Sequence, residues 1–285
     1  MLAILAHPDD ETFGLGGTLA LYAKRGVAVH LICATRGEAG TVSPEFLERY
    51  SSIADLRVAE LNCAAEQLRL EKVHFLDYRD SGMVGTEDNE HPNALAQAPP
   101  EEVVATLVGY IRRLRPQVVI TFDPVGGYGH PDHIAVHKAT VKAYEAAADP
   151  ELFPDAGSPF QSQKLYFSTF SFRFIKPTLA LLRLFGRDPR RWGRNEDMDL
   201  TEIFQTRFPV NAKVNYRKVA DQKRRALACH ASQLDMGPSS RGLLGALFWL
   251  NRAGTVETFM RADPQVSDGR VERDLFQGIR LQAVA

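Results

Sequence analysis

The chain has 285 residues and a mass of 31.7 kDa, which suits one large domain or one domain with an added lobe. Hydrophobic residues make up 45% and charged residues 24%, proportions that are ordinary for a globular protein with a sizeable core. The formal net charge of -1 gives no electrostatic reason for binding nucleic acid, so we expect no nucleic-acid partner.

The first half of the chain alternates between short β-rich runs and helical patterns. Buried strands are predicted at "MLAILA", "VAVHLICAT", "VHFLDY" and "QVVITF", that is at Met1–Ala6, Val27–Thr35, Val73–Tyr78 and Gln117–Phe122. Apolar residues at helical spacing predict helices at Gly17–Arg25, Ser51–Leu70 and about Glu101–Leu114. Strands that alternate with helices predict βαβ crossovers, and so an α/β fold with a mostly parallel sheet covered by helices on both faces.

After about Asp149 the pattern changes, and a loop rich in proline and glycine follows. Beyond it we predict strands at "KLYFSTFSF" (Lys164–Phe172) and "EIFQTRFPV" (Glu202–Val210) and a helix at Asn215–Cys229. We therefore divide the chain into a core, residues 1–150, and a C-terminal α+β extension, residues 151–285, that completes the same domain.

Residues 172–194, "FRFIKPTLALLRLFGRDPRRWGR", combine basic side chains with an apolar helical face. We expect this segment to form a lid or an oligomer contact, within a lid or substrate-pocket region at about 170–215. An ordinary amphipathic core helix is the second interpretation. The least favoured interpretation is contact with a membrane or an anionic lipid-linked substrate, in which the apolar run at 242–250 would join the same patch. Whether the chain forms a homo-oligomer stays open.

The three cysteines, Cys33, Cys63 and Cys229, are widely spaced and form no CxxC motif. Cys33 and Cys63 lie in apolar runs, so we expect buried free thiols. The N-terminal apolar run has no basic leader and is too short for a signal peptide, and no uncharged stretch reaches the length of a membrane span. These observations predict a reducing, cytoplasmic location.

Two polar clusters directly follow predicted buried strands. "AHPDDE" (Ala6–Glu11) follows the first strand, and "TFDPVGGYGHPDH" (Thr121–His133) contains the end of the fourth. In open α/β sheets, ligands bind in the crevice beyond the carboxyl ends of the strands, where adjacent crossovers diverge. We therefore expect both clusters to face one crevice, although they are remote in sequence.

The residue types in these clusters are those of a catalytic metal site. His7 with Asp9 or Asp10, joined by His130 or His133, supplies two imidazoles and one carboxylate, the three ligands and open position of a catalytic zinc. Such a centre lowers the pKa of bound water to about 7, and a second carboxylate beside that water can act as general base. Each piece taken alone has a simpler interpretation, because His-Pro and Asp-Asp pairs also form turns and helix caps.

The glycine-rich stretch "FGLGGT" (Phe13–Thr18) is not a nucleotide-binding motif. It lacks the GxGxxG spacing, and the acidic "HPDDE" precedes it where a phosphate would have to approach. We expect these glycines to permit close packing between the helix and the strand.

Four motifs resemble those of the LmbE-like, or PIG-L, zinc N-deacetylases: "AHPDDE", "HPDH", "TRGEAG" and "DSGM". The resemblance covers about residues 1–147 and returns at "KRRALACHASQ" (Lys223–Gln233). The family includes deacetylases of N-acetylglucosaminyl compounds, namely the phosphatidylinositol glycolipid and the mycothiol and bacillithiol precursors. The resemblance implies a Rossmann-like fold, one Zn²⁺ per chain (or another divalent transition metal) and hydrolysis of an acetamide in a small-molecule amino-sugar conjugate.

The resemblance also implies roles for individual residues. His7, Asp10 and His133 would ligate the zinc, and Asp9 would be the general base. His130, oriented by Asp132, would stabilise the oxyanion or protonate the leaving amine. Whether one residue or a pair serves as acid and base stays open.

Four further positions are predicted to contact the substrate or border its pocket. Arg57 resembles a family arginine that binds sugar or phosphate hydroxyl groups, against the alternative of a solvated helix arginine. Glu38 and Asp80 follow strand ends, where turn formation is the alternative. His230, with Gln233, is expected near the pocket unless it only satisfies its helix end. Of the remaining histidines, we predict structural roles for His30, His74 and His137 and a solvated position for His91.

The leading hypothesis is therefore a zinc-dependent hydrolase that removes an N-acyl group from an N-acetylglucosamine-type conjugate. The alternatives are a non-catalytic or differently specific binding protein on the same fold and, less favoured, a nucleotide-binding Rossmann protein. The aglycone of the substrate is not predicted.

Overall fold

The computed structural model describes residues 1–169, 183–184, 186, 188–190, 201, 206, 208–234, 254–266 and 269–280. Four expectations lie wholly or mostly outside the described residues. They concern the basic segment 172–194, the region 170–215, the strand at 202–210 and the apolar run 242–250. Within the described part of the chain, no helix combines the length and the apolar composition needed to cross a membrane.

In the described part of the chain, seven strands form one sheet in the order β3-β2-β1-β4-β5-β7-β6. They are β1 Leu2–Leu5, β2 His30–Thr35, β3 Lys72–Tyr78, β4 Val118–Thr121, β5 Lys164–Thr169, β6 Ala212–Asn215 and β7 Val256–Asp263. The first five strands pair in parallel, whereas β7 pairs antiparallel with both β5 and β6. The predicted α/β class is confirmed, and the C-terminal strands extend the same sheet.

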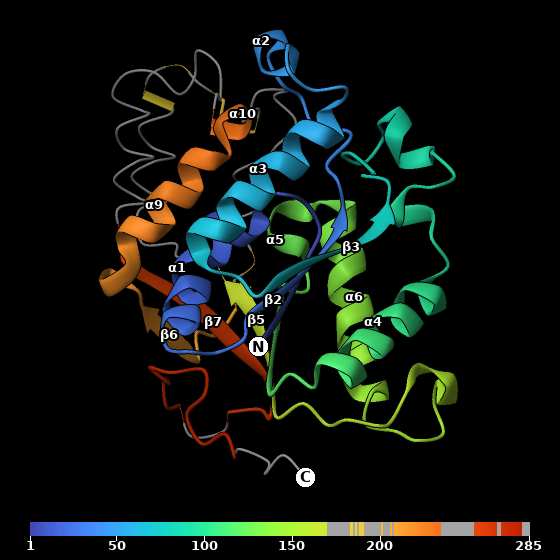
Figure 1. Cartoon of the computed structure of the whole chain (residues 1–285), viewed down its shortest axis with the longest axis vertical. Coiled ribbons are helices and arrows are strands. Elements are labelled where there is room, and N and C mark those ends of the chain that lie inside the picture. Colours follow the sequence, from blue (N-terminus) through green and yellow to red (C-terminus); the bar gives the residue numbers. More distant parts are fainter. Residues whose placement is uncertain are drawn as a thin grey trace.

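Helices cover both faces of this sheet (Figure 1). Among the described residues, the helices of at least ten residues are α1 Asp10–Lys24, α3 Ile53–Leu68, α4 Pro100–Leu114, α6 Pro131–Ala146 and α9 Ala220–Cys229. Helices α1, α3 and α9 pack together on one face, and α4 packs with α6 on the other. The shorter elements are α2 Pro44–Leu47, α5 Gly126–Gly129, α10 Ala231–Leu234, η1 Glu87–Glu90, η2 Leu95–Gln97, η3 Pro154–Ala156 and η4 Arg217–Val219.

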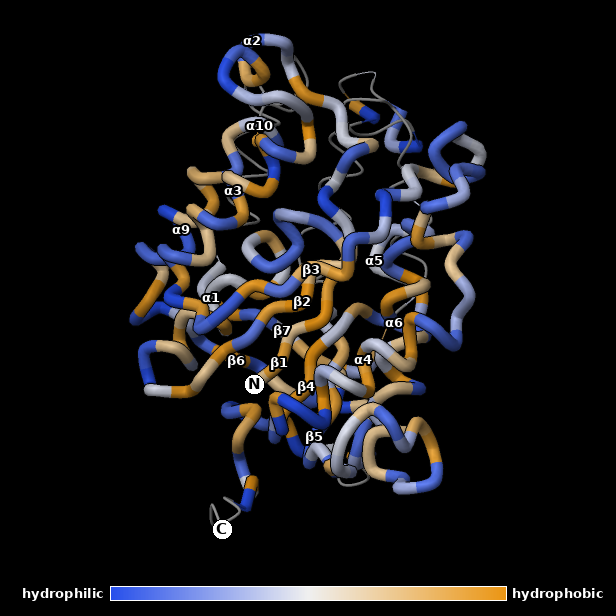
Figure 2. Tube along the Cα trace, turned by 45° about the vertical axis from the view of Figure 1, so that its right-hand side comes forward, coloured by the Kyte–Doolittle hydropathy of each residue, from blue (hydrophilic) through white to orange (hydrophobic). Residues whose placement is uncertain are grey.

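The core lies along the central strands, where Figure 2 shows a band of hydrophobic residues through β1, β2 and β4. All four residues of β1 are buried, and so are all four of β4. Continuous apolar runs of this kind are typical of strands that are covered on both faces.

Two predicted helices have different bounds in the structure. Helix α1 begins at Asp10 rather than at Gly17, because the Asp9 carbonyl accepts the N–H groups of Thr12 and Phe13 and so starts the first turn. Gly17 does mark a close approach, since a Cβ there would lie 2.1 Å from the Tyr216 ring. In the predicted helix at 215–229, only α9 is α-helical, preceded by the end of β6 and the short η4.

Cys63 and Cys229 form a disulfide bond that joins α3 to α9, with 5.8 Å between their Cα atoms. The expectation of a free thiol at Cys63 is therefore wrong, whereas Cys33 is free and buried. The two bridged residues are 166 positions apart, and only the packing of α9 against α3 brings them together. Because disulfides are rare in reducing compartments, the bridge removes the cysteine-based argument for a cytoplasmic location.

Candidate metal centre and its surroundings

The two polar clusters meet at the carboxyl ends of β1 and β4, as predicted. His7 follows β1 directly, and His133 lies in the first turn of α6, which follows β4. The chain passes from β1 to β2 and β3 on one side of β1 and then crosses from β3 to β4 on its other side, so the crevice between β1 and β4 is the topological switch point of the sheet.

The loop between β4 and α6 places His133 through specific backbone contacts. The buried Asp123 accepts hydrogen bonds from the N–H groups of Val125 and Gly127, both at 3.0 Å. Gly126 has a φ of 66°, and a Cβ there would lie 2.9 Å from the Cβ of His133. The glycine therefore allows α6 to begin close to the end of β4.

Three donor groups converge between the two clusters. Nδ1 of His7 lies 3.2 Å from Nε2 of His133, which in turn lies 3.4 Å from Oδ1 of Asp10. Oδ2 of Asp10 lies 3.6 Å from Nδ1 of His7. Tetrahedral zinc with bonds of about 2.0–2.2 Å separates its ligand atoms by ~3.3 Å, so these side chains fit the ion that the family resemblance implies.

Hydrogen bonds on the far side of both imidazoles fix which nitrogen faces this centre. Nδ1 of His133 lies 3.1 Å from the carbonyl oxygen of Gly126, and Nε2 of His7 lies 3.0 Å from Oδ2 of Asp132. In the neutral rings those nitrogens carry the proton, so the lone pairs of His7 Nδ1 and His133 Nε2 face each other at 3.2 Å. Two facing lone pairs repel unless a cation lies between them.

The electrostatics of the centre also favour positive charge. Burial opposes a charge on His7, but the carboxylates of Asp80 and Asp132 raise its pKa well above the ordinary histidine value. Burial and the neighbouring His7 lower the pKa of His133 well below that value. The described residues therefore hold a buried surplus of carboxylates around His7, which a proton or a metal ion can neutralise.

Donor atoms in the described part of the chain form two groups, each within 4.8 Å: His7, His130 and His133, and His7, Asp80, His130 and Asp132. His130 differs from the other two histidines, because its Nδ1 accepts the backbone N–H of Asp132 at 3.2 Å and caps α6. In the neutral ring Nε2 then carries the proton, and burial lowers the pKa of His130 to about 3. In that tautomer, Nε2 of His130 is a hydrogen-bond donor.

Asp132 contacts His130 through its backbone N–H, whereas its carboxylate has other partners. That carboxylate contacts His7 and also accepts from Ser81, from its N–H at 3.0 Å and from its hydroxyl group. The reason is geometric: Asp132 lies in the first turn of α6, and its backbone rather than its side chain reaches His130. A carboxylate behind a ligating histidine fixes that histidine's tautomer.

Asp9 and Arg57 form a buried ion pair beside the centre. Nη2 of Arg57 lies 3.1 Å from Oδ2 of Asp9, and the same nitrogen donates to the Pro8 carbonyl at 2.7 Å. Burial raises the pKa of Asp9 to about 6, while Arg57 acts against this rise. The alternative of a solvated Arg57 is therefore wrong, because its side chain is 5% exposed. A carboxyl group with this pKa is suited to accept a proton near neutral pH.

The other predicted contact residues lie near the centre in different ways. Asp80 is buried, with Oδ1 at 3.4 Å from Nε2 of His7 and 4.0 Å from Nε2 of His130. Glu38 accepts the backbone N–H of Asp80 at 3.0 Å and so holds the loop after β3. His230 is fully buried against Glu11 at 2.8 Å, and Gln233 donates to Ser232 at 2.9 Å.

The remaining histidines have the surroundings of structural residues. His137 is buried, with Nδ1 2.9 Å from the carbonyl oxygen of Phe122. His30 and His74 stack on neighbouring strands, with 3.4 Å between ring nitrogens. His91 is half-buried and accepts the N–H of Asn93 at 3.1 Å.

Sequence reasoning missed Ser81, Tyr128 and the role of Glu11. Ser81 belongs to "DSGM", and its two bonds to Asp132 depend on a contact 51 residues away. The Tyr128 ring meets His133 edge-on at 5.0 Å and His130 at 5.8 Å. Burial raises the pKa of Tyr128 well above its usual value, so the phenol remains a hydrogen-bond donor. The signal available for Tyr128 was its place in "GGYGHPDH", two residues before His130.

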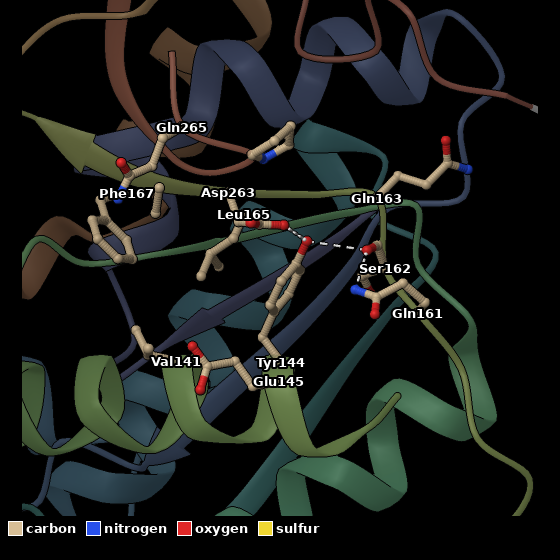
Figure 3. A pocket seen from close by; sticks show the side chains of 12 residues that line it. Val141, Tyr144, Glu145, Gln161, Ser162, Gln163, Leu165, Phe167, Asp263 and Gln265 are labelled. Atoms are coloured by element: carbon tan, nitrogen blue, oxygen red, sulfur yellow. Dashed lines mark hydrogen bonds between the residues drawn. The ribbon is translucent and has the colours of Figure 1, made fainter. Parts of the chain in front are cut away.

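A cavity of about 930 Å³ lies elsewhere, between α6 and the strands β5 and β7. Figure 3 shows Tyr144 of α6 opposite Asp263 of β7, with the phenol oxygen 2.8 Å from Oδ2 of Asp263. None of the predicted site residues lines this cavity. This cavity is therefore separate from the chemical centre.

The fold and the site define the class of protein. It is an α/β protein in which two histidines and an aspartate, side chains that can hold a metal ion, converge at the switch point of the sheet. A family model described as "PIG-L: GlcNAc-PI de-N-acetylase" matches residues 2–144. The chain belongs to the PIG-L family.

Curated relatives match nearly the whole chain. A protein from Rhodococcus erythropolis (strain PR4), named 1D-myo-inositol 2-acetamido-2-deoxy-alpha-D-glucopyranoside deacetylase, is 38% identical over 98% of this chain and 97% of its own length. A protein of the same name from Rhodococcus opacus (strain B4) is 40% identical over 84% of this chain and 83% of its own length.

Solved structures with lower identity share the fold. The N,N'-diacetylchitobiose deacetylase from Pyrococcus horikoshii has a TM-score of 0.61 and 19% identity, covering 98% of this chain and 85% of its own. GalB, the 4-carboxy-2-hydroxymuconate hydratase from Pseudomonas putida KT2440, has a TM-score of 0.60 and 19% identity, covering 94% and 97%. A deacetylase and a hydratase thus share this fold, so the chemistry must be argued from the site.

Proposed function

We propose that this protein is a zinc-dependent deacetylase that removes the acetyl group from an N-acetylglucosaminyl inositol. The chain is an enzyme of the PIG-L family that hydrolyses an amide C–N bond in a conjugate of the N-acetylglucosamine type. The observation that carries the metal assignment is the convergence of His7 Nδ1, His133 Nε2 and the Asp10 carboxylate within 3.2–3.6 Å of one another.

His7, Asp10 and His133 would hold the metal ion. When bound, a zinc ion supplies Lewis acidity, which lowers the pKa of a coordinated water to about 7. Asp132 accepts a hydrogen bond from His7 and Gly126 accepts one from His133, so both rings are held with a lone pair toward the ion.

Asp9 is the general base in this proposal. Its carboxylate is held by Arg57 at 3.1 Å, and its pKa of about 6 suits proton abstraction near neutrality. His130, with Nε2–H free to donate, would stabilise the negative charge that develops on the acetamide oxygen. The proton that Asp9 takes up can then pass to the departing amine.

The inositol glycoside is proposed from the names of the relatives that match almost the whole chain. Residues that would recognise the sugar belong at the rim of the centre, and Arg57, Glu38 and Asp80 remain candidates. Arg57 has its Nη groups committed to Asp9, Pro8 and Gly37, so any substrate contact would be shared with these partners.

Two neighbouring isosteric variants test the proposal. Wild-type protein should contain about one zinc ion per chain and release acetate from N-acetylglucosaminyl inositol in preference to N-acetylglucosamine or N,N'-diacetylchitobiose. Asp10→Asn should lose both metal and activity. Asp9→Asn should keep its metal while kcat falls by ~10²–10⁴-fold, because only the base is removed. Metal analysis and acetate release are the measurements.

Wild-type protein that takes up no divalent metal would overturn the metal assignment. Equal loss of metal in both variants would overturn the division of roles between Asp9 and Asp10. Metal-loaded wild-type protein that leaves the inositol glycoside intact but hydrolyses another amide of the panel would overturn only the choice of substrate.

A further inference from the structure

Asp9 has a backbone conformation that needs support. Its φ is 136° and its ψ is -27°, in a region that residues with a side chain rarely adopt. Residues held in such conformations store strain of roughly 1–3 kcal/mol and persist only where their surroundings fix them. The side chain of Asp9 can face the centre only while this strained peptide is held in place.

Glu11 supplies one direct contact that holds this peptide. Oε2 of Glu11 accepts the backbone N–H of Asp9 at 3.0 Å, which resembles a capping box in which an acidic side chain reaches back to the residue before the helix. The other oxygen, Oε1, accepts from Nε2 of His230 at 2.8 Å and from the hydroxyl group of Thr12. Glu11 is fully buried, so its carboxylate cannot rotate freely into solvent.

His230 is held in turn by contacts on both sides along the chain. Cys229 is bridged to Cys63 of α3, and the N–H and hydroxyl groups of Ser232 donate to the buried Glu60 of α3 at 2.8 and 2.7 Å. The imidazole is therefore fixed against α3 from the residue before it and from two residues beyond it. It has 0% exposure.

We propose that Glu11, backed by His230 and the Cys63–Cys229 disulfide, is a positioning residue that holds the strained Asp9 peptide so that its carboxylate can act as base. The inference rests on the proposed function, because it needs Asp9 to be the base. It gives the C-terminal part of the chain a role in catalysis although none of the proposed metal ligands lies there. It also makes turnover sensitive to the redox state of the Cys63–Cys229 disulfide, although neither cysteine takes part in the reaction.

Glu11→Leu and Glu11→Gln test this inference. In metal-loaded protein, Glu11→Leu should lower kcat by ~10²-fold with KM within about twofold of wild type, because misplacing a catalytic group by about 1 Å has an effect of that size. Glu11→Gln keeps an oxygen that can accept the Asp9 N–H, so it should recover most of this loss. Hydrogen exchange at the Asp9 amide should be faster in Glu11→Leu than in Glu11→Gln.

The disulfide and the imidazole provide independent variants should Glu11→Leu fail to fold. His230→Ala and the double variant Cys63→Ser/Cys229→Ser should both lower kcat several-fold, retain metal and speed exchange at Asp9. A reductant should lower the wild-type kcat to the level of the double variant and leave the double variant unchanged.

Glu272→Gln is the matched control, since Glu272 is a buried carboxylate that contacts Lys164 at 2.7 Å, outside the machinery around Asp9. It should lower the melting temperature without changing kcat or exchange at Asp9. If the Glu11 and His230 variants behave like this control, their role is structural and the inference is wrong. If Asp9→Asn keeps full activity, the proposed function fails instead, and the two failures are thereby distinguished.

Discussion

Two buried clusters of charge lie at opposite ends of the sheet and are neutralised in different ways. At the amino end of β5, Glu272 lies 2.7 Å from both Lys164 and Arg261, and the Tyr166 hydroxyl group donates to it as well. Lys164 also donates to the Gln277 carbonyl at 2.6 Å. Each charged side chain of this cluster contacts an opposite charge within the chain, with the Glu272 carboxylate shared between the two cations.

The cluster at the carboxyl end of β1 has many more acids than permanent cations. Its five carboxylates belong to Asp9, Asp10, Glu11, Asp80 and Asp132, and Arg57 is the guanidinium that contacts one of them directly. Burial raises the pKa of Asp10 to about 6, which shows how unfavourable its charge is there without a further cation. Burial opposes a charge on His230, but Glu11 raises the pKa of this imidazole above the ordinary histidine value.

The cluster around Glu272 contains its own opposite charges, whereas the cluster at the carboxyl end of β1 requires an external cation. Burying a charge costs desolvation free energy at both ends of the sheet. In the amino-end cluster, the attraction of Lys164 and Arg261 to Glu272 offsets this cost. The cavity of about 930 Å³ lies beside the β5 and β7 strands, yet the unmatched charge lies at the switch point. Unmatched buried charge is therefore the better guide to the chemical centre.

Glu272→Gln should produce the largest loss of stability while leaving the metal site intact. Removing the shared anion leaves Lys164 and Arg261 buried or half-buried without it, and breaking a buried pair lowers the free energy of unfolding by ~3–5 kcal/mol. Urea denaturation measures this loss, and metal content should not change. Loss of metal from this variant would show that the two clusters are coupled and would break the comparison.

Asp132→Asn should have an intermediate effect at the other end. Asp132 accepts from His7 and Ser81, and neutralising a carboxylate behind a ligating histidine weakens metal binding or activity by ~10–100-fold. Competition with a chelator measures the affinity. Because the variant removes one of the surplus acids, the apo protein should lose little stability, in contrast to Glu272→Gln. Unchanged affinity would mean that Asp132 supports only the loop of Ser81.

The sequence was sufficient to predict the centre because its signals are local. "AHPDDE" and "HPDH" each follow a buried strand, and the carboxyl ends of parallel strands lie at the same edge of a sheet. The sequence therefore predicts that His7, Asp10 and His133 face one crevice. The assignment of roles within each motif needed the family resemblance, since spacing alone did not separate Asp9 from Asp10. Hydrophobic runs predicted β1 to β4 for the same local reason.

The features that were missed depend on contacts between distant segments. The partner of Cys63 is 166 residues away, and that of Glu11 is 219 residues away. Neither β7 nor the four-residue β6 was predicted, because a buried position of β7 carries Glu257 and the strand therefore lacks an apolar alternation. Asp132 was predicted to orient His130, which its backbone N–H contacts, but the contact of its carboxylate with His7, 125 residues away, was not predicted.

The exposed pair Lys142–Glu101 completes the comparison with the smallest expected effect. Nζ of Lys142 lies 3.4 Å from Oε1 of Glu101, with the side chains 58% and 72% exposed. Both charges remain hydrated after either is removed, so Lys142→Ala should lower the free energy of unfolding by at most ~0.5 kcal/mol and leave kcat unchanged. Urea denaturation beside Glu272→Gln measures the contrast. A loss as large as that of Glu272→Gln would show that charge pairing itself, rather than burial, sets the difference between the clusters.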